Sequence, residues 1–157
     1  MPDKTCRPDS QTTSGVEQPP ITSSLTYLLA QANRVVSGAL ERSLAAEGAQ
    51  LEHWRILEVL SDEQGRSMGE LAQLVLMNHP ALTKMMDRMV SRGWVHRAAD
   101  ESDSRKVLVF ITDEGLEFVA RLRERVESYQ ESLFDSIGDR RADQLKRLLN
   151  TLIREHG

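Results

Sequence analysis

The sequence of residues 67–111 is SMGELAQLVLMNHPALTKMMDRMVSRGWVHRAADESDSRKVLVFI, and this stretch decides the fold of the chain. Ser67 and Glu70 have the spacing of a capping box, in which each side chain satisfies a free backbone amide at the start of a helix. After a short connection, Asn78 is a candidate N-cap of a second helix, with Pro80 in its first turn. The stretch therefore begins with two helices joined by a tight turn.

The second half of the stretch predicts a β-hairpin. Gly93 ends the second helix, because glycine is the usual residue just past a helix C-terminus. Two runs rich in β-forming residues follow, 94–97 and 107–111, and the polar segment 98–106 separates them. Helix, turn, helix and hairpin form the order of a winged helix-turn-helix, whose second helix usually lies in the DNA major groove.

The flanking sequence predicts four further helices. A long amphipathic pattern covers residues 21–46, and a shorter one covers 51–61. Thr112 is the expected N-cap of a long helix, which Gly138 interrupts. A final helix with a leucine-rich stripe follows and continues to near the C-terminus. The predicted fold class is mostly α with a small β-hairpin wing.

The terminal helices carry more apolar surface than one small lobe can cover. A compact winged helix-turn-helix lobe needs only residues 51–111, which leaves the stripes of 21–48 and 112–157 without an obvious partner. Pairing with the same helices of a second chain predicts a homodimer, with two second helices on one face for a two-fold DNA site. The alternative is a bundle closed within one chain.

The N-terminal residues 1–20 are interpreted as a disordered arm ahead of a single domain at 21–157. The arm contains four of the five prolines and only Val16 among the large aliphatic residues. No apolar run approaches the roughly 18 residues of a membrane span, and no signal-peptide core is present, so we expect a cytoplasmic protein without a membrane partner. The single cysteine, Cys6, is interpreted as an incidental thiol rather than a sensor.

Charge is unevenly distributed along the chain. The net charge is −4, but residues 66–97 contain five basic and two acidic side chains, a balance of +3, so that the remainder carries −7. A basic module in an acidic framework is typical of a DNA-binding protein, although a solvated surface gives the same count.

Three blocks of sequence resemble the multiple antibiotic resistance regulator (MarR) family of bacterial transcription factors. They are HPALTKMMDRMVSRGWV at 79–95, DESDSRK at 100–106 and ITDEG at 111–115, within a resemblance that covers about residues 22–156. In the family these blocks are the recognition helix, the wing tip and the start of a dimerisation helix. The chain departs from the family at Ser104, where family members often carry a basic residue.

The resemblance implies a homodimer in which the first, fifth and sixth helices intertwine and two lobes bind DNA. It also implies ligand-responsive regulation, often repression of a palindromic operator, that a small molecule bound between lobe and dimer interface releases. We therefore expect a transcriptional regulator, with double-stranded DNA, a second copy of the chain and a small-molecule effector as partners. The alternative function is a winged-helix protein-interaction module without sequence-specific DNA binding.

The expected DNA-binding residues lie on the outward face of the second helix and at the wing tip. Lys84 and Arg88 can reach bases or phosphates, and Arg105 is the expected minor-groove residue. The resemblance implies that Asp103 holds Arg105 in place; the alternative is a solvated hairpin tip. The complete set is Asn78, His79, Pro80, Ala81, Thr83, Lys84, Arg88, Asp103, Ser104 and Arg105.

The opposite face of the same helix is apolar. It contains Leu82, Met85, Met86, Met89 and Val90, which we interpret as core, because methionine at helical spacing is usually core filler. Asp87 is expected to pair with Arg88 or another arginine and to orient it.

Candidate effector-binding residues lie on the first two helices. An aromatic wall and one or two cations there are suited to an aromatic carboxylate or its coenzyme A thioester, whereas dimer-interface contacts and solvated surface are the alternative. The candidates are Tyr27, Gln31, Arg34, His53, Trp54 and Arg55.

Enzymatic function is not expected. The four histidines have no metal-ligand spacing, and the sequence contains no nucleophile elbow, P-loop or dinucleotide fingerprint. We therefore predict no catalytic residue, no metal site and no cofactor.

Overall fold

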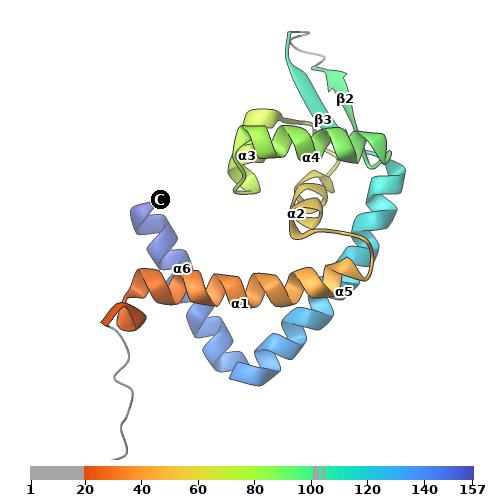
Figure 1. Ribbon diagram of the computed structural model, residues 1–157. Coiled ribbons are helices and arrows are strands. Elements are labelled where there is room, and N and C mark those ends of the chain that lie inside the picture. The colour runs from red at the N-terminus through yellow and green to blue at the C-terminus, as the bar shows by residue number, and fades with distance from the viewer. Residues whose placement is uncertain (1–19, 101–102, 104) are drawn as a thin grey trace, which may run out of the picture. The chain divides into compact units, whose positions relative to one another are not determined.

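The computed structural model describes residues 20–100, 103 and 105–157 (Figure 1). The chain divides into two compact units, Met1–Val35 and Val36–Gly157, and each is described by itself. The boundary falls inside helix α1 (Leu25–Ala45). The arm predicted at residues 1–20, including Cys6, lies outside the described residues apart from Pro20.

The first unit contains a short 3-10 helix and the start of α1. The helix predicted to begin at Ile21 begins instead at Leu25, because Pro20–Ser23 forms the 3-10 turn η1. The amide of Ser24 donates to the carbonyl oxygen of Ile21 at 3.0 Å and closes this turn. Apolar side chains of this unit are exposed, including Leu25, Leu28 and Val35.

The second unit contains the predicted helix-turn-helix, built from α2 (Leu51–Leu60), α3 (Met68–Leu74) and α4 (His79–Ser91). The capping box at the start of α3 is confirmed, since the Ser67 hydroxyl accepts from the Glu70 amide and the Glu70 carboxylate accepts from the Ser67 amide at 2.8 Å. The predicted end of α4 is also confirmed, because Gly93 follows it with a φ of 74°. Local sequence therefore sets both ends of this motif.

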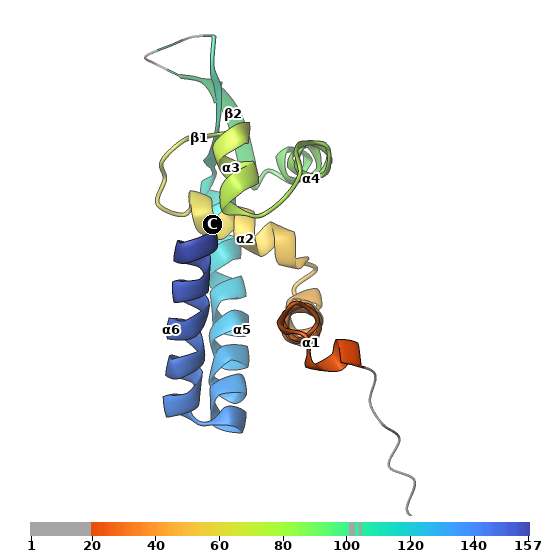
Figure 2. The same ribbon diagram turned by 90° about the vertical axis from the view of Figure 1, so that its left-hand side faces the viewer.

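The wing is a three-stranded antiparallel sheet rather than the predicted hairpin alone. Strands β2 (Val95–Ala99) and β3 (Val107–Ile111) form the hairpin, and β1 (Arg66–Ser67) pairs with the other edge of β3 (Figure 2). The missed strand has only two residues, so it carries no alternating pattern, and its pairing depends on a strand about 40 residues later in the chain. It holds the base of the wing against the start of α3.

The core of the second unit lies between α2, α3, α4 and the sheet, and residues 118–126 of the helix that follows the wing and the end of α1 complete it. The methionine interpretation is confirmed, since Met86 and Met89 are fully buried and Met85 is 8% exposed. Val90 is an exception at 37% exposure, so the apolar face of α4 is narrower than predicted. The largest of the fully buried side chains are Leu44, Ile56, Leu57, Leu60, Leu71, Leu82, Met86, Met89, Leu122, Val75, Val95 and Val109.

Two long helices follow the wing, α5 (Asp113–Ile137) and α6 (Asp139–His156). Thr112 caps α5 as predicted, because its hydroxyl accepts from the Gly115 amide at 3.0 Å. The Trp94 ring stacks on Phe118 at a centroid distance of 4.2 Å and anchors α5 to the lobe. Helices α5 and α6 meet at Gly138 and diverge from there in Figure 1, and Ala142, in the first turn of α6, is buried.

Helix α6 exposes most of its apolar stripe. Leu145, Leu148 and Ile153 are 50%, 61% and 65% exposed. The described part of the chain contains no helix that is both long and apolar enough to span a bilayer.

Candidate nucleic-acid interface

The N-terminus of α4 presents a capped but open helix end. The Asn78 side-chain oxygen accepts from the Ala81 amide at 2.9 Å, which confirms Asn78 as the N-cap. His79, Pro80 and Ala81 are exposed. The first turn of a helix presents free amides and a partial positive charge, so this end of α4 is suited to a phosphate group.

The outward face of α4 carries two free cations. Lys84 and Arg88 are exposed, and neither makes an ion pair within the part of the chain that the structure describes. Thr83 is exposed too, but its hydroxyl donates to the His79 carbonyl oxygen at 2.9 Å. The Thr83 hydroxyl can therefore donate to a phosphate only if this internal bond opens, whereas Lys84 and Arg88 need no such change.

Asp87 connects α4 to the wing. Its carboxylate accepts from the Arg97 guanidinium at 2.8 Å, so its partner is Arg97 on β2 and not the adjacent Arg88. Exposed ion pairs contribute only about 0–1 kcal/mol to stability, so the main effect of this pair is geometric. Arg97 was not among the predicted site residues, and its contact with Asp87 holds β2 against α4.

The wing tip contains the predicted aspartate–arginine pair. The Arg105 Nε and Nη2 atoms donate to the two carboxylate oxygens of Asp103 at 3.0 and 3.3 Å, and the Arg105 amide also donates to this carboxylate at 3.2 Å. The Arg105 side chain is nevertheless 89% exposed. Ser104, the point of departure from the family, lies outside the described residues. Asp103 therefore fixes the direction of a cation that remains open to solvent.

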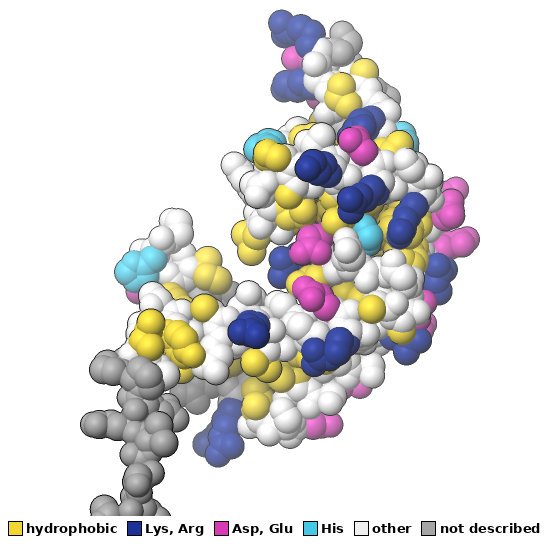
Figure 3. Space-filling model, in the orientation of Figure 1, with side chains coloured by type: hydrophobic (Ala, Val, Ile, Leu, Met, Phe, Trp, Pro, Cys, Tyr) yellow, Lys and Arg dark blue, Asp and Glu magenta, His cyan; other side chains and the backbone are white. Residues whose placement is uncertain are grey.

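Lys and Arg side chains gather on the face that carries α4, β2 and β3 (Figure 3). This face brings together the α4 cations and the wing tip, which are separated in sequence by the first wing strand and the hairpin turn. A protruding helix beside a basic wing is an arrangement that matches a DNA groove and the neighbouring backbone.

The predicted effector-binding residues are distributed over both units. Tyr27, Gln31 and Arg34 are exposed on the first unit, whereas His53, Trp54 and Arg55 belong to α2 of the second. The hypothesis of a pocket formed by both groups stays a prediction, since each unit is described by itself.

His53 belongs to the core of the lobe. It does not line a pocket together with Trp54 and Arg55. It is 4% exposed, its Nδ1 accepts from the Gln50 amide at 3.1 Å, and its ring meets Trp94 edge-on at 5.3 Å. Burial, together with the positive charge of Arg92, lowers the pKa of His53 from 6.5 to about 4. His53 is therefore neutral at physiological pH.

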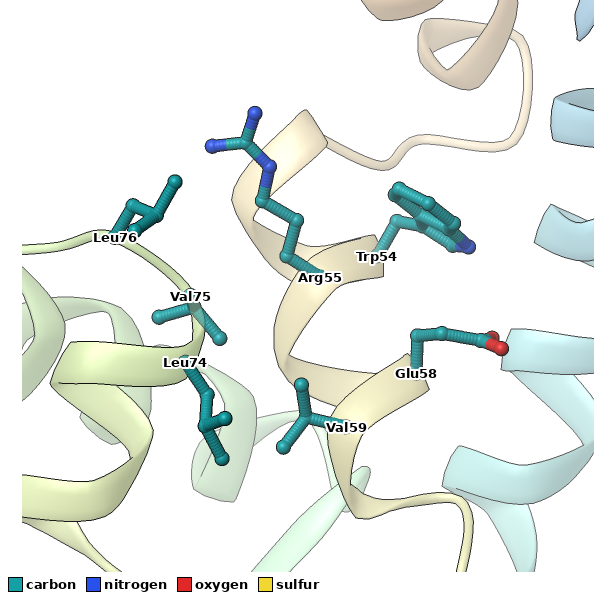
Figure 4. A pocket seen from close by; sticks show the side chains of 7 residues that line it. All are labelled: Trp54, Arg55, Glu58, Val59, Leu74, Val75 and Leu76. Atoms are coloured by element: carbon teal, nitrogen blue, oxygen red, sulfur yellow. The ribbon is translucent and has the colours of Figure 1, made fainter. Parts of the chain in front are cut away.

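Trp54 and Arg55 line a pocket between α2 and the turn from α3 to α4, which we call the turn pocket (Figure 4). Its volume is about 220 Å³. Figure 4 shows the aliphatic side chains facing one another between α2 and the turn, with Arg55 and Leu76 at one end. The lining residues are Trp54, Arg55, Glu58, Val59, Leu74, Val75 and Leu76.

Trp54 also borders a second pocket, between α2 and α5, which we call the α2–α5 pocket. Across it the Arg123 guanidinium donates to Glu58 at 2.9 Å and to the Ser61 hydroxyl at 2.6 Å. The indole Nε1 of Trp54 is buried without a hydrogen-bond partner among the described residues. A buried unsatisfied donor costs about 1–3 kcal/mol, so Nε1 is poised to donate to a ligand or a water.

Metal ligation has no support in the described ranges, where no three His, Cys, Asp or Glu side chains are grouped closely enough to hold an ion.

Comparison with known proteins gives concordant matches to one group of regulators. A family model described as the MarR family matches residues 48–106, from just before α2 to the residue that precedes β3. The homoprotocatechuate degradative operon repressor of Escherichia coli is 25% identical over 130 residues, which cover 83% of this chain and 88% of that protein.

Two solved structures have the same fold. A MarR family transcriptional regulator, SPO1453 from Silicibacter pomeroyi DSS-3, has a TM-score of 0.78 and 28% identity, over 89% of this chain and all of that one (100%). The transcriptional repressor CouR, bound to a 23-mer DNA duplex, has a TM-score of 0.79 and 25% identity, over 85% of this chain and 94% of that one.

Proposed function

This chain belongs to the MarR family of transcriptional regulators, and from this premise we propose that it represses transcription by binding a palindromic operator as a homodimer, until a small molecule releases it. The lobe at 51–111 supplies the DNA contacts, and residues 21–48 and 112–157 supply the dimer interface. The proposed DNA-binding residues are Asn78, His79, Pro80, Ala81, Thr83, Lys84, Arg88, Asp103, Ser104 and Arg105.

The observation that carries the DNA-binding proposal is the pair formed by Asp103 and Arg105. The Asp103 carboxylate accepts from two guanidinium nitrogens of Arg105 and from the Arg105 backbone amide. These bonds hold the 89% exposed Arg105 side chain in one direction. Such an arginine is prepared for a narrow minor groove, while the free cations of α4 occupy the adjacent major groove. The likeness to CouR, whose structure is bound to a DNA duplex, supports this use of the fold.

The dimer proposal depends on the exposed stripe of α6. Leucine and isoleucine side chains that are 50–65% exposed in one chain are the kind of surface that a second copy covers. A two-fold dimer places two α4 helices against successive turns of the same DNA face, which requires a pseudo-palindromic operator.

The effector is proposed to be an aromatic acid or its coenzyme A thioester. Trp54 and Arg55 are its candidate contacts on the second unit, and Tyr27, Gln31 and Arg34 are separate candidates on the first. The relative from Escherichia coli is named as a repressor of an operon for degrading homoprotocatechuate, an aromatic acid, which supports this class of effector. Given its burial, His53 supports the α2 N-terminus instead of touching the ligand.

A gel shift with the promoter region beside the protein's own reading frame tests the proposed function. We expect a shifted complex with this duplex and much weaker binding to a duplex of the same length and composition with a shuffled sequence. Equal binding to both duplexes, or to neither, contradicts the proposal and favours a winged-helix module that binds a protein partner.

A further inference from the structure

A third pocket of the lobe lies between the start of α2 and the second half of α4, and we call it the α2–α4 pocket. Its volume is about 200 Å³. The lining residues are Gly48, Gln50, His53, Arg88 and Arg92. Two of these five residues are cations and none is acidic, so the pocket carries positive charge.

The two arginines have the same charge and the spacing of neighbours on a helix. Arg88 and Arg92 are four residues apart at the end of α4, which places their side chains on one face. Neither arginine makes an ion pair within the described ranges of the chain. Like charges at this spacing destabilise a helix, and an anion from outside the chain would relieve their repulsion.

The Arg92 side chain is held in position beside the pocket. Its guanidinium lies over the Trp94 ring, 4.8 Å from the centroid, and Nη1 makes a long hydrogen bond of 3.5 Å to the Gly48 carbonyl oxygen. These contacts occupy one flat face and one nitrogen, so the remaining N–H groups can donate to a ligand. A side chain that is already oriented loses less conformational entropy when a ligand binds.

His53 supplies a buried donor to the same pocket. The ring is 4% exposed, and its Nδ1 accepts from the Gln50 amide, so the proton of the neutral ring is on Nε2. Nε2 has no hydrogen-bond partner among the residues that the structure describes. Burial and then the charges of Arg92 and Arg88 lower the pKa of His53, which indicates that both guanidiniums lie near this ring.

The start of α2 adds further positive potential. Gln50 is the N-cap of this helix of 10 residues, whose first turn has free backbone amides and a partial positive charge. Glu52 is the acidic residue of that turn, but it lines a separate hollow with Glu41 and Ala45. The carboxylate of Glu52 is therefore not part of the α2–α4 pocket.

We propose that the α2–α4 pocket binds a phosphate of the DNA backbone, at the edge of the major groove that α4 enters, through Arg92 and the Nε2 proton of His53, beside Arg88. This inference rests on the proposed DNA-binding function and adds Arg92 and His53 to its contacts. Arg88 belongs both to this pocket and to the outward face of α4, so a duplex on that face has its backbone near the pocket. A free phosphate ion has the same chemistry, and the experiments below distinguish the two sources.

The variant Arg92→Gln tests the cation, with Arg147→Gln on the polar side of α6 as the matched control. Operator affinity of the full-length protein should fall about 10-fold or more, because a hydrogen bond to a charged group is lost in each protomer. The slope of log affinity against log salt concentration should decrease by about 2, since the dimer loses two phosphate contacts. The promoter duplex and its shuffled counterpart should be weakened by the same factor, because a phosphate carries no sequence information. Arg147→Gln should behave as wild type.

A second variant, Gln50→Glu, keeps the inference testable if Arg92→Gln is unstable. A carboxylate at the start of α2 favours the helix but repels a phosphate in the pocket. The thermal midpoint should therefore stay the same or rise while operator affinity falls. Unchanged operator affinity in this variant would contradict the inference.

Operator duplexes with one phosphate replaced by a neutral methylphosphonate locate the contact. We expect one position in each half-site at which the replacement weakens wild type but has no further effect on Arg92→Gln. Calorimetry with inorganic phosphate, for wild type and Arg92→Gln, measures whether the pocket also holds a free ion.

Two outcomes overturn the inference. The first is an Arg92→Gln protein that is folded and keeps the operator affinity and salt slope of wild type; if it loses inorganic phosphate at the same time, the pocket is a site for a free anion. The second is a methylphosphonate scan that gives the same profile for both proteins. A wild-type protein that does not bind its operator contradicts the proposed function instead.

Discussion

Helices α4 and α6 are both amphipathic, but the apolar face is buried in α4 and exposed in α6. The apolar side of α4 packs into the lobe, where Leu82, Met86 and Met89 are fully buried. The apolar side of α6 leaves Leu148 61% exposed and Ile153 65% exposed. The apolar face of α4 is therefore covered within the chain and its polar face is exposed, whereas α6 has an exposed apolar face.

The difference indicates two kinds of interface. The exposed cations of α4 are suited to an anionic partner. The apolar face of the helix already fixes its position, so its unpaired positive charges are available for contacts with phosphates. Exposed leucines on α6 suit an apolar partner, and a second copy of the same helix is such a surface. If α4 binds DNA and α6 forms the dimer, as proposed, we expect substitutions on the two helices to separate the two properties.

The largest expected effect comes from breaking the apolar face of α6. Leu148→Asp places a charge in the proposed dimer interface, so we expect a monomer in analytical ultracentrifugation. Operator affinity should fall by about 10² or more, because two linked lobes gain an effective concentration that single lobes lack. Asn150→Asp, on the polar side of α6, is the control and should remain dimeric. A Leu148→Asp protein that is still dimeric would refute the assignment of α6.

The pH dependence of stability tests the buried position of His53 in the lobe. The pKa of His53 is lowered from 6.5 to about 4, so the unfolded chain takes up this proton at a higher pH than the folded chain does. Its contribution to the free energy of unfolding is therefore complete above pH 6.5 and is lost as the pH falls toward about 4, at up to about 1.4 kcal/mol per unit.

Urea unfolding of wild type and His53→Gln across this interval measures the contribution. We expect the wild type to lose more stability than the variant as the pH falls. Parallel pH profiles would mean that His53 is hydrated in the folded protein.

The outward side of α4 and the wing should matter for DNA alone. Arg88→Ala and Arg105→Ala should each weaken operator binding by about 5- to 150-fold, because one arginine contact to a base is worth about 1–3 kcal/mol. Their thermal midpoints and their dimeric state should match wild type, as should those of the control Arg147→Ala on the polar side of α6, which should also keep full affinity. If either DNA-binding variant loses affinity only because it unfolds, the site assignment fails.

The smallest effect is expected in the turn between α3 and α4. Leu76→Gly removes the left-handed strain at an 82% exposed position, so the free energy of unfolding should rise by about 0.5–1 kcal/mol even after the entropy cost of glycine. Leu74→Gly, at the end of α3, should lower it by about 1 kcal/mol, because glycine is a poor helix former. A loss of stability in Leu76→Gly would show that the leucine side chain stabilises the turn.

The features that sequence predicted are those with local causes. Ser67 and Asn78 cap α3 and α4 through side-chain bonds that span three residues, and the pattern Leu82, Met86, Met89 follows the helical period. Such features depend on neighbours in the chain. The helix-turn-helix, the wing hairpin and most of the core could therefore be predicted.

The features that sequence did not predict depend on distant partners. The strand β1 exists because β3 returns beside it, and the choice of Arg97 over Arg88 as the partner of Asp87 depends on how β2 crosses α4. In the same way, His53 is adjacent to Trp54 in sequence but faces the core, because Trp94 packs against it. Sequence spacing therefore could not show that His53 packs in the core while Trp54 lines a pocket.

The salt dependence of operator binding tests the central claim most directly. The claim is that α4 and the wing bind DNA mainly through cations on a helix already fixed in the lobe. With about 6–10 phosphate contacts in the dimer, affinity for the promoter duplex should fall by about 10³ to 10⁵ between 50 and 200 mM salt. Arg105→Ala should reduce the slope of log affinity against log salt concentration. A tight complex whose affinity does not change over this interval would contradict the account.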